Sequence, residues 1–135
     1  MIAQFNIAMA RETEDKALDE ATVRAGALGV IEDASRGFYL IAQGSDSVVG
    51  ALLVTREWSD WRNGDLWWIQ SVYVSPASRR QGVFRALYEA VVCRAQESAV
   101  RGIRLYVEHE NETAKAVYKS LQMTQTPYQV FERML

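Results

Sequence analysis

Apolar residues in the first part of the chain recur at helical spacing. They share one side of a helix over residues 2 to about 11, and again over residues 21–31. Asp19 stands just before the second segment, where an aspartate side chain accepts hydrogen bonds from the free amides of a first helical turn. The pattern predicts two helices, the second of which begins after Asp19 and ends near residues 35–37.

The middle of the chain changes to strand patterns. Residues 37–43 and 48–58 are rich in β-branched, aromatic and aliphatic side chains, and the polar turn 44–47 separates them. This arrangement predicts an antiparallel hairpin. A second polar stretch leads into a third strand over residues 66–74, and Pro76 prevents its ladder from continuing.

The second half alternates helices and strands. An amphipathic helix is predicted from Gly82 to about Ala99, a half-buried strand over residues 102–108, a shorter helix over 112–121 and a final strand over 128–134. This order favours one α/β domain over residues 1–135, built on a mixed sheet. Cys93 falls in the middle of the long helix, where we expect a small buried side chain.

Composition excludes several classes of protein. The chain has 135 residues, 15 Lys and Arg against 17 Asp and Glu, one cysteine and one histidine. A disulfide framework and a Cys/His metal cage are therefore excluded within one chain, so no metal is expected. The slightly acidic balance argues against a nucleic-acid partner. No apolar run is long enough for a membrane span, so we expect a soluble, cytoplasmic protein with no membrane partner.

The most informative segment is residues 72–84, in which a strand ends, a short basic loop follows and a helix begins at glycine. The first turn of a helix has free amides and a partial positive charge, which together favour a bound phosphate. Arg79 and Arg80 add positive charge, and Gly82 allows close approach of a ligand to the backbone. The alternative is a plain connection that carries two solvated arginines.

Two spaced motifs carry a resemblance to a known family. The first is Arg79-Arg80-Gln81-Gly82-Val83-Phe84; the second, one helix and one strand later, combines Asn111, Ala114 and Tyr118. From about Gly37 to its end the chain resembles the Gcn5-related N-acetyltransferase (GNAT) family. Phe84 and Gln122 depart from it, because the family has a small residue and a glycine at these positions.

This resemblance implies a fold and a co-substrate. The fold is a mostly antiparallel mixed sheet flanked by helices, in which the strand that usually opens the family's fold is here short, replaced or absent. The co-substrate is acetyl-CoA, with the pyrophosphate on the loop amides and the pantetheine on the end of the preceding strand. The implied binding residues are Val72, Tyr73, Val74, Arg79, Arg80, Gln81, Gly82, Val83, Phe84 and Asn111.

The resemblance also implies catalytic roles. Tyr118 matches the general acid that protonates the departing CoA thiolate. Gln70 stands where several members have a glutamate base, and an amide cannot accept that proton. A water bound by Gln70 could pass the proton to Glu57, Asp60 or Glu108, of which Glu108 is our candidate. A covering role for Tyr118 on the sheet is the alternative.

All four tryptophans lie within eleven residues, from Trp58 to Trp68. Aromatic faces attract alkylammonium groups, so we expect Trp58, Asp60 and Trp61 to line the site of a small-molecule or peptide amine acceptor. Core packing together with a dimer contact is the alternative.

Two functions remain open at this stage. The first is an acetyl-CoA-dependent N-acetyltransferase that works by direct transfer in a ternary complex. The second is a non-catalytic acyl-CoA-binding module, which is favoured by Gln70, Phe84 and the missing first strand. The absent strand would leave a sheet edge open, which favours a homodimer.

Overall fold

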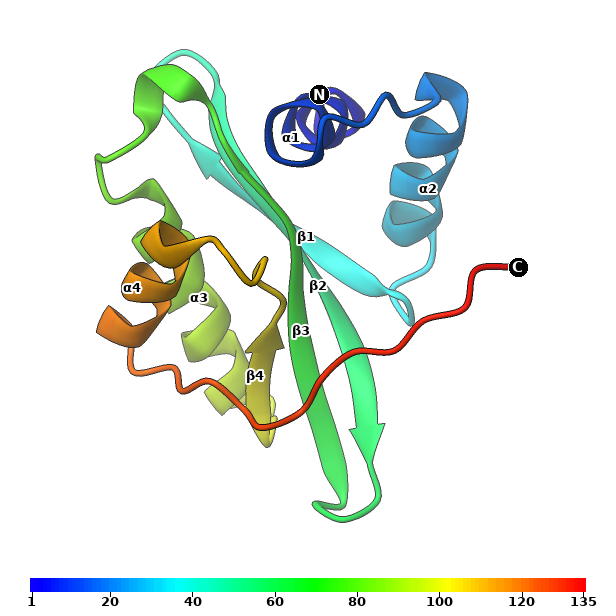
Figure 1. Ribbon diagram of the computed structural model, residues 1–135, viewed down its shortest axis with the longest axis vertical. Coiled ribbons are helices and arrows are strands. Elements are labelled where there is room, and N and C mark those ends of the chain that lie inside the picture. Colours follow the sequence, from blue (N-terminus) through cyan, green and yellow to red (C-terminus); the bar gives the residue numbers. More distant parts are fainter.

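The computed structural model describes residues 1–135 and has helices on both sides of a four-stranded sheet (Figure 1). Its elements are α1 (Ile2–Glu14), α2 (Glu20–Glu32), β1 (Gly37–Gln43), β2 (Val48–Ser59), β3 (Gly64–Val74), the 3₁₀ turn η1 (Pro76–Ser78), α3 (Val83–Glu97), β4 (Gly102–Leu105) and α4 (Glu112–Ser120). The chain opens with a helix, and the mixed α/β class expected from the sequence is confirmed.

The sheet has the strand order β1-β2-β3-β4. β1, β2 and β3 pair antiparallel, whereas β3 and β4 run parallel. The parallel pairing needs a crossover, and α3 supplies it between the two strands. The predicted mixed, mostly antiparallel sheet is therefore present.

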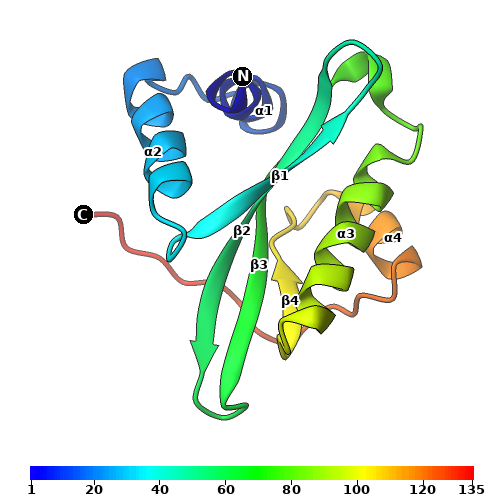
Figure 2. The same cartoon turned by 180° about the vertical axis from the view of Figure 1, so that it is seen from behind.

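The main core lies between the sheet and α3. Leu52, Val54 and Val91 are completely buried there, and each such aliphatic side chain stabilises the fold by about 1.5–3 kcal/mol. Seen from behind, α3 covers this face, and α4 lies beside it (Figure 2). α1 and α2 lie on the other side of the sheet (Figures 1 and 2). Their contact with it includes Phe5 of α1, whose ring centroid is 4.9 Å from that of Tyr73 on β3.

A β-bulge interrupts β3 close to its end. Ala51 pairs with Tyr73 and Leu53 pairs with Gln70, so β3 holds one extra residue opposite β2. Ser71 takes up this extra length with a left-handed φ of 49°. The insertion reverses the alternation of side chains, so that Val72 packs against the core and Tyr73 faces α1.

Three predictions are wrong in detail. Residues 128–134 form no strand: the segment is exposed, and no backbone or side-chain hydrogen bond ties it to the sheet. A strand needs a hydrogen-bonded neighbour, and this segment has none. β4 ends at Leu105 rather than near Glu108, because its pairing with β3 stops there. Cys93 is exposed rather than buried, on the solvent side of α3.

None of the helices is both long and apolar enough to cross a membrane.

Candidate functional site

A cleft of about 650 Å³ opens where β3 and β4 separate. Pairing between the two strands ends at Ile69 and Leu105, so the edge of β3 that faces β4 is unpaired over residues 70–74. α1 and α4 complete the walls. The cleft is lined by Met9, Thr13, Glu14, Ile69, Gln70, Ser71, Val72, Phe84, Leu105, Tyr106, Val107, Glu108, Asn111, Ala114, Val117 and Tyr118.

The first turn of α3 adjoins this cleft. Gly82 is the N-cap, with φ at +80°, and no side chain caps the helix. The six consecutive backbone amides of residues 80–85 donate to no other group of the chain. Phe84 of this turn lines the cleft, so the turn that carries these free amides adjoins it. Free amides at a helix start form an anion-binding arrangement, which the sequence motif led us to expect.

The two arginines of the loop differ in their contacts. Arg79 Nε donates to the Val74 carbonyl oxygen over 3.0 Å, and Arg79 Nη2 lies 2.5 Å from Glu12 Oε2. Arg80 has a left-handed φ of 62°, is exposed and forms neither a hydrogen bond nor an ion pair. Gln81 Nε2 donates to the Ala77 carbonyl oxygen over 2.9 Å, which ties the loop to η1. The free charge in the loop is therefore that of Arg80.

Tyr118 lines the cleft from α4. Its ring meets Phe84 edge to face, with centroids 5.8 Å apart, and Phe84 also contacts Tyr88 over 6.3 Å. Phe84, the residue that departs from the family motif, thus packs between α3 and α4. Burial raises the pKa of the Tyr118 phenol above its ordinary value, so the hydroxyl remains protonated at neutral pH.

α4 is fixed in place at its first turn. Asn111 Oδ1 accepts a hydrogen bond from the Ala114 amide over 3.0 Å, which caps the helix. Lys115 donates to the His109 carbonyl oxygen and, over 2.8 Å, to Glu112 Oε1. In this structure the side-chain oxygen of Asn111 thus serves the helix, and α4 presents Tyr118 to the cleft.

The candidate proton acceptors have different surroundings. Gln70 lines the cleft and donates to Thr55 Oγ1 over 2.6 Å. Glu57 is paired with Arg104 over 2.9 Å, whereas Glu108 lines the cleft, is exposed and has no ion-pair partner. Of the carboxylates considered from the sequence, the structure brings only Glu108 to the cleft.

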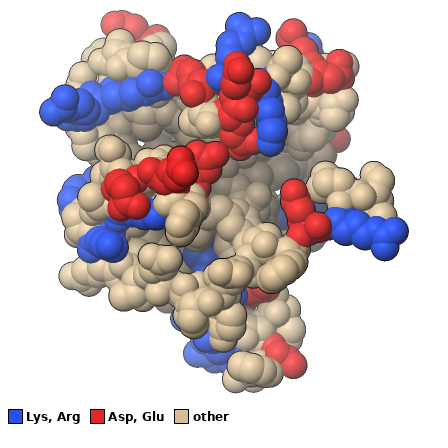
Figure 3. Space-filling view, viewed as in Figure 1, with Lys and Arg blue, Asp and Glu red and all other residues tan.

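The cleft also has residues that the sequence did not reveal. Met9, Thr13 and Glu14 come from α1, more than fifty positions before the motif, so no local pattern points to them. Ser71 is the bulge residue, and its serine side chain gives no sign of a left-handed backbone. Figure 3 shows that this face of the molecule is hollowed near its centre and that acidic side chains gather around the hollow.

The tryptophan cluster divides into two groups. Trp67 is buried in the core, and Trp68 stacks on Tyr106 with centroids 4.6 Å apart. Trp58 and Trp61 are 64% and 86% exposed at the β2–β3 end of the sheet, together with Asp60. Trp58 pairs with Asp65, and the strand from Asp65 to the cleft residue Gln70 is about 17 Å long. The structure does not bring these hairpin residues into the cleft.

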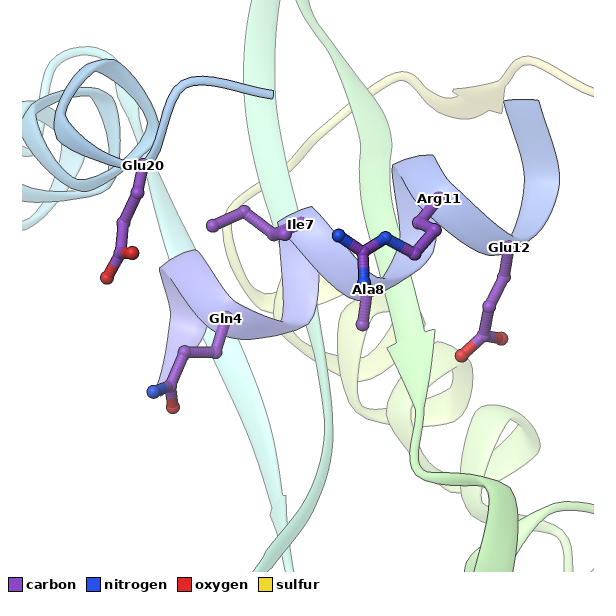
Figure 4. Close-up of a pocket in the computed structure, with 6 residues that line it drawn as sticks. All are labelled: Gln4, Ile7, Ala8, Arg11, Glu12 and Glu20. Atoms are coloured by element: carbon purple, nitrogen blue, oxygen red, sulfur yellow. The ribbon is translucent and has the colours of Figure 1, made fainter. Parts of the chain in front are cut away.

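A second, shallow pocket of about 440 Å³ lies against α1 and the start of α2 (Figure 4). Its lining residues are Gln4, Ile7, Ala8, Arg11, Glu12 and Glu20. Four of these six side chains are polar or charged, and they spread along α1 and the start of α2 rather than converge on one point (Figure 4). No group of three or more His, Cys, Asp or Glu side chains in the molecule is placed to hold a metal ion.

Comparison with known proteins identifies the family. The model of the acetyltransferase (GNAT) family matches residues 4–122. A search of curated proteins finds no match.

Solved structures agree with this match. A structure described as a possible acetyltransferase from Clostridium difficile 630 is 41% identical, with a TM-score of 0.92 over 99% of this chain and 89% of that one. A probable acetyltransferase, 18% identical, has a TM-score of 0.86 over 99% and 89% of the two chains. A transcriptional regulator from Bacillus halodurans C-125, 17% identical, has a TM-score of 0.82 over 99% and 93%. The last two similarities concern the fold alone.

Proposed function

The chain belongs to the acetyltransferase (GNAT) family, and on that premise we propose that it is an N-acetyltransferase that moves the acetyl group of acetyl-CoA to a primary amine. The observation that carries the proposal is the continuity of two features: the cleft at the unpaired edge of β3 and the six free amides at the start of α3. One suits an acyl arm, and the other suits a diphosphate.

Acetyl-CoA would bind across these two features. The amides of residues 80–85 would hold the pyrophosphate, with Arg80 as the neighbouring positive charge. Backbone groups from Val72 to Val74, apart from the Val74 carbonyl oxygen that already accepts from Arg79, would hold the pantetheine by strand-like hydrogen bonds. The loop and the end of β3 would thus bind acetyl-CoA mainly through backbone groups. Phe84 is compatible with this binding as long as its ring stays between α3 and α4.

The proposed reaction is a direct transfer in a ternary complex. The neutral amine attacks the thioester carbonyl carbon, a C–N bond forms and the C–S bond breaks, so that the products are the acetamide and CoA. A backbone amide near the bulge at Ser71 would stabilise the oxyanion that develops on the carbonyl. Tyr118 would donate its phenolic proton to the departing thiolate and recover one from solvent.

The amine must lose one proton before attack and a second one after it. Glu108 is the proposed acceptor of the first proton, directly or through a water held by Gln70. Glu14 also lines the cleft but is paired with Lys16, so the unpaired negative charge of the cleft is that of Glu108. This charge favours a cationic acceptor, either a small amine or the amino group of a peptide.

The hairpin residues Trp58, Asp60 and Trp61 are relevant to only one of these acceptor types. Trp58 lies about 13 Å along the sheet from Ile69, the nearest cleft residue of β3, so a small amine bound in the cleft would not reach the hairpin residues. An extended peptide bound in the cleft could reach these hairpin residues. Equal acceptor KM values in the wild type and in the Trp61→Ala variant, for a peptide that the enzyme acetylates well, would rule out this contact.

The decisive experiment is a free-thiol assay with acetyl-CoA and a panel of small and peptide amines. Thiol release that depends on an amine, with the acetylated amine found by mass spectrometry, supports the enzyme. Tight CoA binding in calorimetry without release for any amine supports the acyl-CoA-binding module instead. Absence of CoA binding would overturn both.

We also propose a homodimer. β4 is the outer strand of the sheet, and its free edge is a template for another strand. The segment 124–135 exposes Tyr128, Val130, Phe131 and Met134 and makes no hydrogen bond within the chain. A second copy could satisfy both features.

A further inference from the structure

One carboxylate from α1 reaches the anion-binding loop. Glu12 Oε2 lies 2.5 Å from Arg79 Nη2, and Glu12 Oε1 accepts a hydrogen bond from the Tyr73 hydroxyl over 3.3 Å. These partners are 67 and 61 positions away in the sequence and stand on either side of Val74. Glu12 therefore joins α1 to the end of β3 and to the start of the loop at once.

Arg79 is held on three sides. Besides Glu12, its Nε donates to the Val74 carbonyl oxygen over 3.0 Å, and its guanidinium carbon lies 5.6 Å from the centroid of the Tyr73 ring. Tyr73 itself is 9% exposed and is packed against Phe5 of α1. The guanidinium is thus turned toward α1 and the strand end, where its charge is already balanced by a carboxylate.

The rest of the loop has few contacts of its own. Arg80 and Gly82 are both in the left-handed region, and Gln81 makes the one other side-chain hydrogen bond, back to Ala77. The Glu12–Arg79 pair is partly exposed, so by itself it adds less than about 1 kcal/mol to stability. Its consequence is geometric, because it fixes where the loop leaves β3.

We propose that Glu12 is a positioning residue: with Arg79 it forms a staple that sets the loop amides for the diphosphate, while Arg80 alone supplies the loop charge that meets the ligand. The proposal rests on the proposed function, and it divides the roles of two adjacent arginines that the sequence motif treats alike. Figure 4 shows Glu12 near the C-terminal end of α1, pointing away from Arg11, its neighbour in sequence.

The test is a double-mutant cycle on CoA binding, measured by calorimetry at low and high salt. Glu12→Gln and Arg79→Gln should each weaken binding about fivefold, and the double variant should be no weaker than either, because each removes the same staple. Arg80→Gln should weaken binding about tenfold, add to Glu12→Gln and reduce the salt dependence. Arg11→Gln is the matched control: it lies next to Glu12 on α1, has no ion-pair partner and should bind CoA as the wild type does.

Two results would overturn the division of roles. If Arg79→Gln and Glu12→Gln were additive, or if Arg79→Gln removed the salt dependence as Arg80→Gln does, Arg79 would be a phosphate ligand. If Glu12→Gln left the CoA affinity unchanged, the loop would not depend on the staple.

The staple can also be tested without any ligand, so its failure and that of the proposed function are distinguishable. Burial first, and then the Glu12 charge, raise the pKa of Tyr73, whereas Arg79 lowers it. The Tyr73 phenol, followed by NMR in the free protein, should therefore titrate at lower pH in Glu12→Gln and at higher pH in Arg79→Gln. Shifts in these directions without CoA binding would refute the proposed function but keep the contact. Absence of both shifts would refute the staple.

Discussion

At the scale of single residues, three unusual backbone conformations lie at the end of β3 and in the loop that follows it. Ser71 and Arg80 are two of the six non-glycine residues with positive φ, and Gly82 adds a third such position in the same region. Ser71 turns β3 at its bulge, and Arg80 and Gly82 shape the loop. Such conformations cost free energy and persist where neighbouring structure holds them, which is common at functional sites.

Gly82 gives the first prediction. A Cβ at this position would meet nothing within 4 Å, so Gly82→Ala has space, but its φ of +80° is strained for any residue with a side chain. We expect a loss of about 1–2 kcal/mol in the free energy of unfolding and weaker CoA binding, because the loop amides would shift. Urea denaturation and calorimetry measure the two effects.

The matched control is Gly26→Ala. Gly26 lies within α2, where an added Cβ also meets nothing within 4 Å and φ is not positive. Alanine should stabilise α2 by about 0.5–1 kcal/mol and leave CoA binding unchanged. If Gly82→Ala were as harmless as Gly26→Ala, the left-handed cap would not matter.

Tyr118 gives the second prediction. A thiolate leaves readily without help, so Tyr118→Phe should lower kcat by about 100-fold or less, the lower end for general acids, with a nearly unchanged KM for acetyl-CoA. Burial raises the pKa of Tyr118, so its donor form persists at neutral pH and is lost only as the pH rises through that raised value. The alkaline fall in kcat should therefore occur above pH 10 in the wild type and be absent in Tyr118→Phe. Full activity of the variant across the profile would remove Tyr118 from the mechanism.

At the scale of elements, hydrophobic spacing and local caps predicted most of the fold. α2 begins after Asp19 as expected, because Asp19 accepts from the Thr22 amide over 2.8 Å. α3 and the β1–β2 hairpin also match, since their signals lie within the segments themselves. The strand predicted over residues 128–134 is absent because strand-forming residues do not by themselves specify a hydrogen-bonding partner. The Glu12–Arg79 contact was missed for the same reason: no local pattern links residues 67 positions apart.

α4 gives the third prediction. Its cap is the Asn111 side chain, and the helix is only nine residues long, so Asn111→Ala should cost about 1 kcal/mol and let the first turn fray. Because α4 presents Tyr118, kcat should fall as well. Asp19→Ala removes a similar cap from α2, which does not line the cleft, so it should lower stability without lowering kcat. Thermal unfolding and steady-state rates on both variants separate the effects, and equal kcat losses would contradict a specific role of the α4 cap.

At the scale of the whole molecule, the outer edge of β4 is unpaired, and residues 124–135 belong to no helix or strand. Segment 124–135 leaves the α4 side, crosses the sheet and ends near α2, away from the outer edge of β4 (Figure 1). Its large apolar side chains are exposed, with Phe131 at 91%. An exposed apolar segment of this kind indicates an interaction surface. In a two-fold pair, each copy could add this segment to the β4 edge of the other, which would pair that edge in both sheets.

The last prediction follows from this pairing. Deletion of residues 124–135 should change a dimer into a monomer in sedimentation velocity, because it removes the strand that each copy would lend. Secondary structure should remain, since these residues make no hydrogen bond within the chain. Phe131→Lys in the full chain should weaken the dimer in the same direction, whereas Ile31→Lys, which changes an exposed apolar side chain on α2, should not. A full-length chain that stays monomeric at high concentration, or a truncated one that stays dimeric, would show that the β4 edge is closed in another way.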